Sequence, residues 1–200
     1  MRAAFAFDLD GTITKYELLP IIARALGLEV EMATLTKVTL AGHIGFEESF
    51  RLRCAILKSV SISRVRQLIQ NVELDEHIEA FIRSNRDQCF VVTGNLDTWI
   101  APIVERLGCR SFSSTAMSRG DSLLGVDTVL TKGFAVNALR QNGFGRIIAI
   151  GDSVNDVSMF EGADVGVAYG GIHEPAAPLI EISNYVAYTG ASLCRLLTTL

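Results

Sequence analysis

Two aspartates near the start of the chain, Asp8 and Asp10, are the first residues whose type and spacing could do chemistry. They follow the apolar run 3–7 and stand directly before Gly11. Side chains two residues apart at the end of a strand project to the same side, so both carboxylates can reach one ligand. A calcium loop is excluded because the twelfth residue from Asp8 is Leu19, where a bidentate Glu is required. Taken alone, the cluster could also be a solvated acidic turn.

A second polar cluster, Asp152, Asn155 and Asp156, follows the apolar run 147–151. A calcium loop fails here as well, since the twelfth residue from Asp152 is Ala163. Alone, this cluster is equally consistent with a tight turn from strand to helix. Two acidic strand ends together favour a metal, and hard oxygen ligands without a neighbouring His or Cys set indicate Mg²⁺ rather than Zn²⁺.

Two further elements could contact a phosphate group. Thr93, Gly94 and Asn95 come at the expected end of a strand and offer a hydroxyl and backbone N–H groups, which bind phosphate readily. Good helix-capping residues alone would explain the same types. Lys132 is the only lysine after Lys58 and stands at the start of a helical pattern between this turn and the second acidic cluster. An isolated surface charge is its structural alternative.

The elements that must position these residues alternate between buried strands and helices. Short runs rich in Val, Ile and Phe predict strands, and the helical patterns between several of them are long enough for right-handed crossovers. The predicted fold is therefore α/β, with a doubly wound parallel sheet and helices on both faces. The expected strands are 3–7, 89–93, 147–151, 165–168 and 185–188, and the expected crossover helices are 76–86, 97–107 and 132–141.

One interval breaks this alternation. Residues 14–72 contain amphipathic stretches at 18–26, 30–40, 46–57 and 62–69 but no convincing strand. We therefore expect a core domain of residues 1–13 and 73–200 and a helical cap subdomain of residues 14–72. The insertion leaves after the first strand, at the carboxyl edge where parallel sheets bind ligands, so it could act as a lid.

Composition sets the class of protein. Of the 200 residues, 49% are hydrophobic and 20% are charged, which excludes a disordered chain. The net charge of −4 and the absence of a Lys or Arg run give no attraction to nucleic acid or to a membrane surface. The N-terminus reaches Asp8 before a signal-peptide region could develop, and the four cysteines have no C-x-x-C spacing, so we expect a cytoplasmic protein with reduced thiols.

Taken together, the four elements resemble the haloacid dehalogenase (HAD) superfamily of phosphatases. The resemblance covers essentially the whole chain, with the motifs at Asp8–Thr12, Thr93, Lys132 and Gly151–Asp156. Because a helical insertion follows the first motif, the chain is most similar to the phosphoserine phosphatase branch. That resemblance implies a Rossmann-like core with a small four-helix cap and a small-molecule phosphate ester as the partner. It says nothing of the oligomeric state.

The resemblance also implies roles. Asp8 would attack phosphorus and form an aspartyl-phosphate, while Asp10 would protonate the leaving group and then activate water. Mg²⁺ would be held by the Asp8 carboxylate, the Asp10 backbone carbonyl and Asp152. The remaining motif residues would contact the phosphoryl oxygens or complete the site, with Asp156 behind the metal ligands: Thr93, Gly94, Lys132, Asn155 and Asp156.

The substrate side of the resemblance is carried by residues of the insertion. Glu17 stands where the branch has a Glu facing the substrate amino group, Phe46 where a Phe walls the pocket, and Arg53 where an Arg pairs with the substrate carboxylate. Each could instead have a purely structural role. Gly11 and Asn95 depart from the branch, which usually has Ser and Gly there, and Asn95 could bind a different substrate.

Phosphoserine or a similar carboxylate-bearing ester is therefore the first expectation. Three alternatives stay open. The substrate could be another small phosphate ester such as a sugar phosphate, or the reaction could be phosphotransfer to another alcohol. The protein could also be a catalytically silent regulatory module that binds Mg²⁺ and phosphate. The scattered histidines, His43, His77 and His173, suggest no ligand set.

Overall fold

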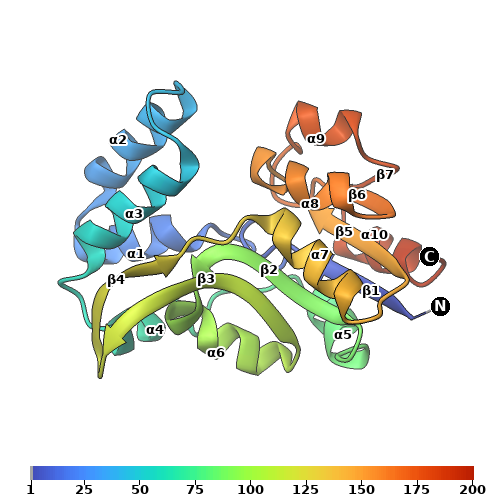
Figure 1. Cartoon of the computed structure of the whole chain (residues 1–200), viewed down its shortest axis with the longest axis horizontal. Helices are drawn as coiled ribbons and strands as arrows, with labels where there is room; N and C mark the ends of the chain where they lie inside the picture. The colour runs from blue at the N-terminus through green and yellow to red at the C-terminus, as the bar shows by residue number, and fades with distance from the viewer. Residues whose placement is uncertain (1) are drawn as a thin grey trace.

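The computed structural model of the protein describes residues 2–200 and shows one seven-stranded sheet with helices on both faces (Figure 1). The strands lie in the order β4-β3-β2-β1-β5-β6-β7, and all neighbours are parallel except β3 and β4. The predicted α/β fold is confirmed. The strands are β1 (Ala3–Phe7), β2 (Cys89–Leu96), β3 (Arg110–Arg119), β4 (Ser122–Thr128), β5 (Arg146–Gly151), β6 (Val165–Tyr169) and β7 (Tyr185–Ala187).

The helices follow the expected ranges closely, because their apolar residues recur at helical spacing. Five of them lie between β1 and β2, and the others connect or follow the later strands. They are α1 (Leu18–Leu26), α2 (Glu29–Leu40), α3 (Phe46–Leu57), α4 (Ile62–Ile69), α5 (Glu76–Ser84), α6 (Asp97–Leu107), α7 (Lys132–Gln141), α8 (Val157–Gly162), α9 (Ala177–Glu181) and α10 (Gly190–Leu197), with a short 3₁₀ turn η1 (Val154–Asp156) before α8.

Strand β1 shows how the two faces of the sheet are filled. Its side chains alternate, so Phe5 and Phe7 join the cluster under α5, α6 and α10, while Ala4 and Ala6 face α7 and α8. All four are buried. Because both faces of β1 are covered by helices, β1 lies in the centre of the sheet. Its carboxyl end therefore lies at the centre of the edge where the parallel strands end.

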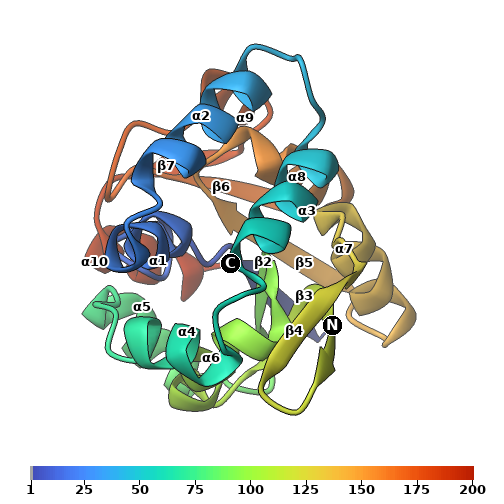
Figure 2. The same ribbon diagram turned by 90° about the vertical axis from the view of Figure 1, so that its left-hand side faces the viewer.

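Helices α1 to α4 are the elements of the predicted cap. Seen from their side, α3 lies between α2 and β4 (Figure 2). Helix α4 packs against α6, and one hydrophobic cluster runs from Phe50 and Leu57 of the helical segment to Phe7 and Trp99 of the sheet side. The helical segment is therefore packed firmly on the sheet, and the exact division at residues 13/14 and 72/73 stays a prediction.

The hairpin of β3 and β4 is the main difference from the predicted elements. Its residues are mostly exposed or half-buried and lack an apolar run, so periodicity gave no strand signal there. Strand β2 also continues to Leu96 rather than ending at Thr93, with a shift in its register on β3 between those residues. Over residues 2–200, none of the helices combines the length and the apolar character needed to cross a lipid bilayer.

Candidate active site

A cavity of about 420 Å³ lies at the carboxyl edge of the sheet, beneath α2 and α3. The ends of β1, β2 and β5 and the start of α7 each contribute a predicted residue to it, because parallel strands all end at this edge. Asp156 contacts the lining from behind. The predicted residues that line the cavity are Asp8, Asp10, Glu17, Phe46, Arg53, Thr93, Gly94, Asn95, Lys132, Asp152 and Asn155.

Lys132 binds two carboxylates at the base of the cavity. Its Nζ donates to Asp8 and, at 2.5 Å, to Asp156 Oδ1, and the lysine is only 7% exposed. Burial acts to lower the pKa of Lys132, but Asp156 and Asp8 offset it and raise that pKa above its ordinary value. Lys132 is therefore a fixed positive charge beside Asp8, and the alternative of a solvated surface lysine is wrong.

Asp156 and Asp152 have opposite surroundings although they are four residues apart. Asp156 Oδ2 accepts hydrogen bonds from the backbone N–H groups of Asp152 and Ser153, at 3.1 and 2.9 Å, and Oδ1 accepts from Lys132. Neither carboxylate oxygen of Asp152 accepts a hydrogen bond, although the residue is only 2% exposed. Asp156 thus holds the loop and the lysine in place, while Asp152 presents two oxygens without a hydrogen bond to the cavity.

The arrangement of these carboxylates fits a divalent metal ion. Oxygens of Asp8, Asp152 and Asp156 lie within 4.8 Å of one another. Buried carboxylates without hydrogen bonds are costly unless a cation meets them. Burial, together with Asp156, raises the pKa of Asp152 to about 6, and burial raises the pKa of Asp8 well above its usual range despite the opposing effect of Lys132. An all-oxygen donor set of this kind suits a hard cation.

Asp10 is held at both carboxylate oxygens. The backbone N–H of Leu18 donates to Oδ1 at 2.8 Å, and the side-chain amide of Asn95 donates to Oδ2. Burial raises the pKa of Asp10 although both of these hydrogen bonds act to lower it. The same Asn95 amide lies 3.2 Å from Thr93 Oγ1, in the irregular stretch of β2. The structure therefore places Asn95 on Asp10, whereas its predicted role was toward the substrate.

The helical segment contributes an aromatic wall and two charges. An ideal Cβ built on Gly94 would lie 3.1 Å from Phe46 Cζ, so the Phe46 ring rests on the bare backbone of β2. Arg53 is half-buried, donates from Nη2 to Thr36 at 3.0 Å and has an unpartnered buried Nε. Partial burial lowers the pKa of Arg53.

Glu17 completes this side of the cavity. It is exposed as a whole, but its carboxyl end faces the cavity. There, removal from bulk water and the nearby charge of Asp10 raise the pKa of Glu17 to about 7. A carboxyl group and a guanidinium thus line the same side of the cavity.

Sequence reasoning missed several cavity residues, above all His173. Its Nε2 lies 2.8 Å from Asp152 Oδ2. The signal was available, because His173 follows β6 and the rule that strand ends meet at one edge applies to β6 as well. Other missed lining residues come from helix faces that point to the cavity only after packing; they include Thr36, Thr39, Ser49 and Phe50.

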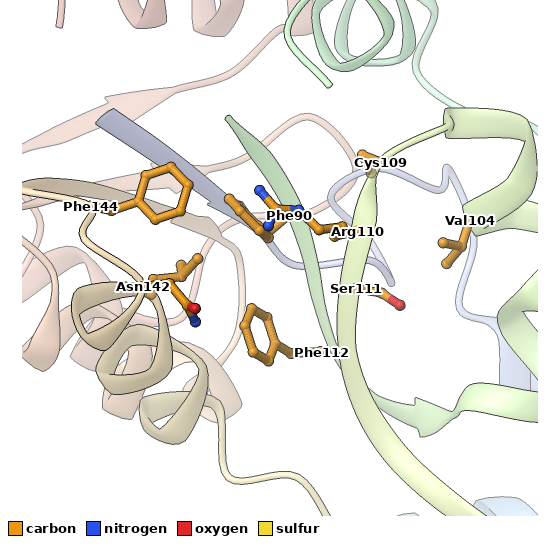
Figure 3. Close-up of a pocket in the computed structure, with 9 residues that line it drawn as sticks. Phe90, Val104, Cys109, Arg110, Ser111, Phe112, Asn142 and Phe144 are labelled. Carbon is orange, nitrogen blue, oxygen red and sulfur yellow. The ribbon is translucent and has the colours of Figure 1, made fainter. Parts of the chain in front are cut away.

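A second cavity, of about 350 Å³, lies at the opposite edge of the sheet, where β2 and β3 begin (Figure 3). The guanidinium of Arg110 lies 4.4 Å from the centre of the Phe90 ring on one side of it. Its lining contains no carboxylate and no lysine. Of these two cavities, only the first is lined by carboxylates and a lysine.

Fold and site together define a phosphatase of the HAD type. The family model described as haloacid dehalogenase-like hydrolase matches residues 5–161, so the chain belongs to that family. Within it, the chain resembles the phosphoserine phosphatase branch. A phosphoserine phosphatase of Methanocaldococcus jannaschii is 29% identical over 181 residues, which are 82% of this chain and 83% of the relative.

Two further relatives agree. A phosphoserine phosphatase of Archaeoglobus fulgidus is 25% identical over 84% of this chain, which spans about half (52%) of that longer relative. A solved structure described as a phospho-aspartyl intermediate analogue of phosphoserine phosphatase superposes with a TM-score of 0.80 at 26% identity, covering 100% of this chain and 99% of the other. The chain is thus a HAD-type phosphatase that resembles this branch, and its own substrate is a separate question.

Proposed function

We propose that the protein hydrolyses a small phosphate monoester with Mg²⁺ through an aspartyl-phosphate on Asp8. The observation that carries the proposal is one cavity in which Asp8 faces a buried lysine and the carboxylate of Asp152, neither oxygen of which accepts a hydrogen bond. A phosphate dianion repels an attacking carboxylate, so positive charge must be present at that point before the two can meet. Lys132 supplies part of it, and a cation on Asp152 would supply the rest.

Mg²⁺ bound to the Asp8 carboxylate, the Asp10 carbonyl and Asp152 would offset the charge of the phosphoryl group. An Asp8 oxygen attacks phosphorus, the ester P–O bond breaks, and the proton of Asp10 goes to the leaving alkoxide. Asp10 then takes a proton from water, the water oxygen attacks phosphorus, and the bond from phosphorus to Asp8 breaks to release phosphate. Thr93, Gly94 and Lys132 hold the phosphoryl oxygens, and Asn155 completes the site.

Phosphoserine is the substrate that the mouth of the cavity supports best. Arg53 has an unpartnered Nε for a carboxylate, and Glu17 offers a carboxylate for an ammonium group. Phe46 would wall the carbon chain between them. The relatives described as phosphoserine phosphatases support the same assignment. A phosphate ester without these two charged groups would give neither Glu17 nor the Arg53 Nε a charged partner.

The role of Asp8 can be tested with the isosteric variant Asp8→Asn. Its side chain cannot form the aspartyl-phosphate, so we expect turnover of phosphoserine with Mg²⁺ to fall by at least about a thousandfold. Mass spectrometry of acid-quenched protein should show a phosphorylated peptide containing Asp8 in the wild type only. Wild-type turnover by Asp8→Asn would refute the mechanism, whatever the substrate.

The role of Arg53 can be tested separately with two substrates. Arg53→Ala removes one charged hydrogen-bond partner of the carboxylate, so we expect KM for phosphoserine to rise about 10- to 100-fold. Phosphoethanolamine has the same ammonium and phosphate groups but no carboxylate, so its KM should change little. Equal changes for the two substrates would remove the assignment of Arg53 while leaving that of Asp8 intact.

A further inference from the structure

Three groups that can bind a transition metal meet at the mouth of the cavity. A carboxylate oxygen of Glu17, one of Asp152 and a ring nitrogen of His173 all lie within 4.8 Å of one another. They come from three different places in the chain, namely the loop before α1, the end of β5 and the loop after β6. This set differs from the all-oxygen set of Asp8, Asp152 and Asp156 because it includes an imidazole.

Asp152 gives an independent indication that a cation belongs there. The residue is 2% exposed, and neither of its carboxylate oxygens accepts a hydrogen bond. His173 Nε2 lies 2.8 Å from Oδ2, but the two atoms do not form an aligned hydrogen bond. A buried carboxylate has up to four acceptor positions, so one cation at the inner side leaves oxygen lone pairs for a second one at the mouth.

The second ring nitrogen of His173 is placed as in known metal sites. Nδ1 lies 3.2 Å from the carbonyl oxygen of Glu174, so an N–H at that position can donate to it. In the neutral tautomer with its proton on Nδ1, Nε2 keeps the lone pair that would bind a cation beside Asp152. Tyr188 donates to the Glu174 carboxylate at 2.9 Å and holds the loop in this position. The imidazole is therefore oriented before any ion arrives.

Gly11 provides the space for this group. A Cβ at position 11 would lie 2.6 Å from Asp152 Oδ2 and 3.3 Å from His173 Nε2, and the φ of +76° also disfavours any side chain. His173 can therefore reach Asp152 only because residue 11 has no side chain. The absence of a side chain at position 11 thus makes room for the contact between His173 and Asp152.

We propose that Glu17, Asp152 and His173 form a second cation site that binds Zn²⁺. One imidazole and two carboxylates are a donor set that Zn²⁺ uses with a fourth position left open, whereas Mg²⁺ prefers oxygen ligands alone. The binding itself does not depend on the proposed function. The effect of Zn²⁺ on activity does depend on the proposed function. Zn²⁺ on Glu17 would exclude a substrate ammonium group from the same carboxylate, so Zn²⁺ would act as an inhibitor.

The test is zinc binding measured by equilibrium dialysis and calorimetry on the whole protein, without substrate and with Mg²⁺ in excess. We expect one Zn²⁺ in the wild type, and a loss of affinity of about 100-fold or more in His173→Ala, since even partners of the ligands contribute tenfold or more. His77→Ala is the matched control, because His77 does not line the cavity, and it should bind as the wild type does.

Two further measurements separate coordination from a folding effect. Co²⁺ in place of Zn²⁺ should give the intense visible absorption of a four-coordinate site in the wild type and in His77→Ala but not in His173→Ala. Glu17→Gln, an isosteric change on a different loop, should also weaken binding. Wild-type zinc affinity in His173→Ala, or no zinc bound by the wild type, overturns the proposal. Failure of the proposed function would instead appear as absent turnover with Mg²⁺ while zinc binding persists.

Discussion

At the scale of single residues, the site depends on which carboxylate oxygens already have partners. Both oxygens of Asp156 are occupied, and both oxygens of Asp10 accept hydrogen bonds. Those of Asp152 accept none. Three aspartates of the same chemical type thus have three different surroundings, and the proposed mechanism would use them for three tasks: holding a loop and a lysine, holding a proton in a fixed place, and meeting a cation.

Asn95 illustrates how a contact changes the expected role of a residue. If its amide orients Asp10, Asn95→Ala should impair protonation of a poor leaving group. We expect kcat/KM for phosphoserine, which covers formation of the aspartyl-phosphate, to fall about tenfold. The aryloxide of p-nitrophenyl phosphate leaves without a proton, so kcat/KM for this substrate should change less than about twofold.

The same two substrates distinguish this role from the one first predicted for Asn95. A residue that binds the serine moiety would raise KM for phosphoserine and leave its kcat unchanged. Initial rates over a range of both substrates, at saturating Mg²⁺, give the comparison. Equal losses with the two esters would show that Asn95 does not act through the acid.

At the scale of elements, the β3–β4 hairpin fixes the helical segment over the site. Arg51 of α3 donates from Nη1 to the Val126 carbonyl of β4 at 2.7 Å. In the hairpin turn, the Asp121 carboxylate accepts from Ser63 N at 2.7 Å, and the Asp121 carbonyl accepts from Ile62 N at 2.9 Å, both at the start of α4. The hairpin therefore holds two helices of the segment, and its β3 also pairs with β2 beside the site, with Ser113 opposite Thr93.

Contact between α3 and β2 can be tested at Gly94. This glycine has an ordinary negative φ, so Gly94→Ala is tolerated by the backbone, but the new methyl group meets the Phe46 ring. We expect KM for phosphoserine to rise several-fold because the first turn of α3 moves outward. Adding Phe46→Leu should restore much of the loss, with a coupling on the order of 1 kcal/mol between the two positions.

The measurement is a double-mutant cycle on kcat/KM, with circular dichroism to check that each variant folds. Additive effects of the two substitutions would contradict the contact. Gly125→Ala is a suitable control, since Gly125 lies in β4 and its Cβ would meet only Met117 of the hairpin.

The elements that could be predicted from the sequence are those with a strong hydrophobic period. The runs around Phe5, Val91 and Ile148 are buried strands, and the helices of the 14–72 interval begin and end within a residue of the predicted limits. The hairpin was missed because its strands are polar at most positions and are held by pairing and by contacts with α3 and α4. The hydrophobic period of a segment does not reveal such long-range contacts.

The site was predictable to the same extent and for the same reason. Residues at the ends of β1, β2 and β5 meet because parallel strands share one carboxyl edge. The motifs recognised in the sequence identified these residues. The partner that each residue contacts was not predictable. Asn95 contacts Asp10, and His173 contacts Asp152. Both contacts depend on side-chain positions that follow from packing of the loops after β2 and β6.

At the scale of the whole molecule, the helical segment and the sheet form one packed unit. The cluster that contains Phe5, Trp99 and Ile150 also contains Ile22 and Cys54, so no apolar boundary separates the two parts. Repulsion between charges at the site should therefore lower the free energy of unfolding of the entire fold. A cation that binds only the folded state should correspondingly stabilise all of it.

This coupling predicts an unusual pH dependence for the metal-free protein. The pKa of Asp152 is raised from 3.8 to about 6, and the pKa values of Asp8 and Asp10 are raised as well. Acids with a raised pKa hold protons in the folded state that the unfolded state has released, so the stability falls as the pH rises from about 4 through about 6. For Asp152 the difference amounts to about 3 kcal/mol at neutral pH.

We therefore expect the Tm of the protein in chelator to be several degrees higher at pH 5 than at pH 7.5, and Mg²⁺ to remove most of this difference by raising the Tm at the higher pH. Differential scanning calorimetry measures both effects. Asp152→Asn replaces the charge with a neutral side chain of the same shape, so it should flatten the pH dependence and abolish the response to Mg²⁺. A metal-free wild type that is more stable at pH 7.5 than at pH 5 would show that the repulsion among these carboxylates is already offset within the protein, and a cation would then not be needed to hold the site together.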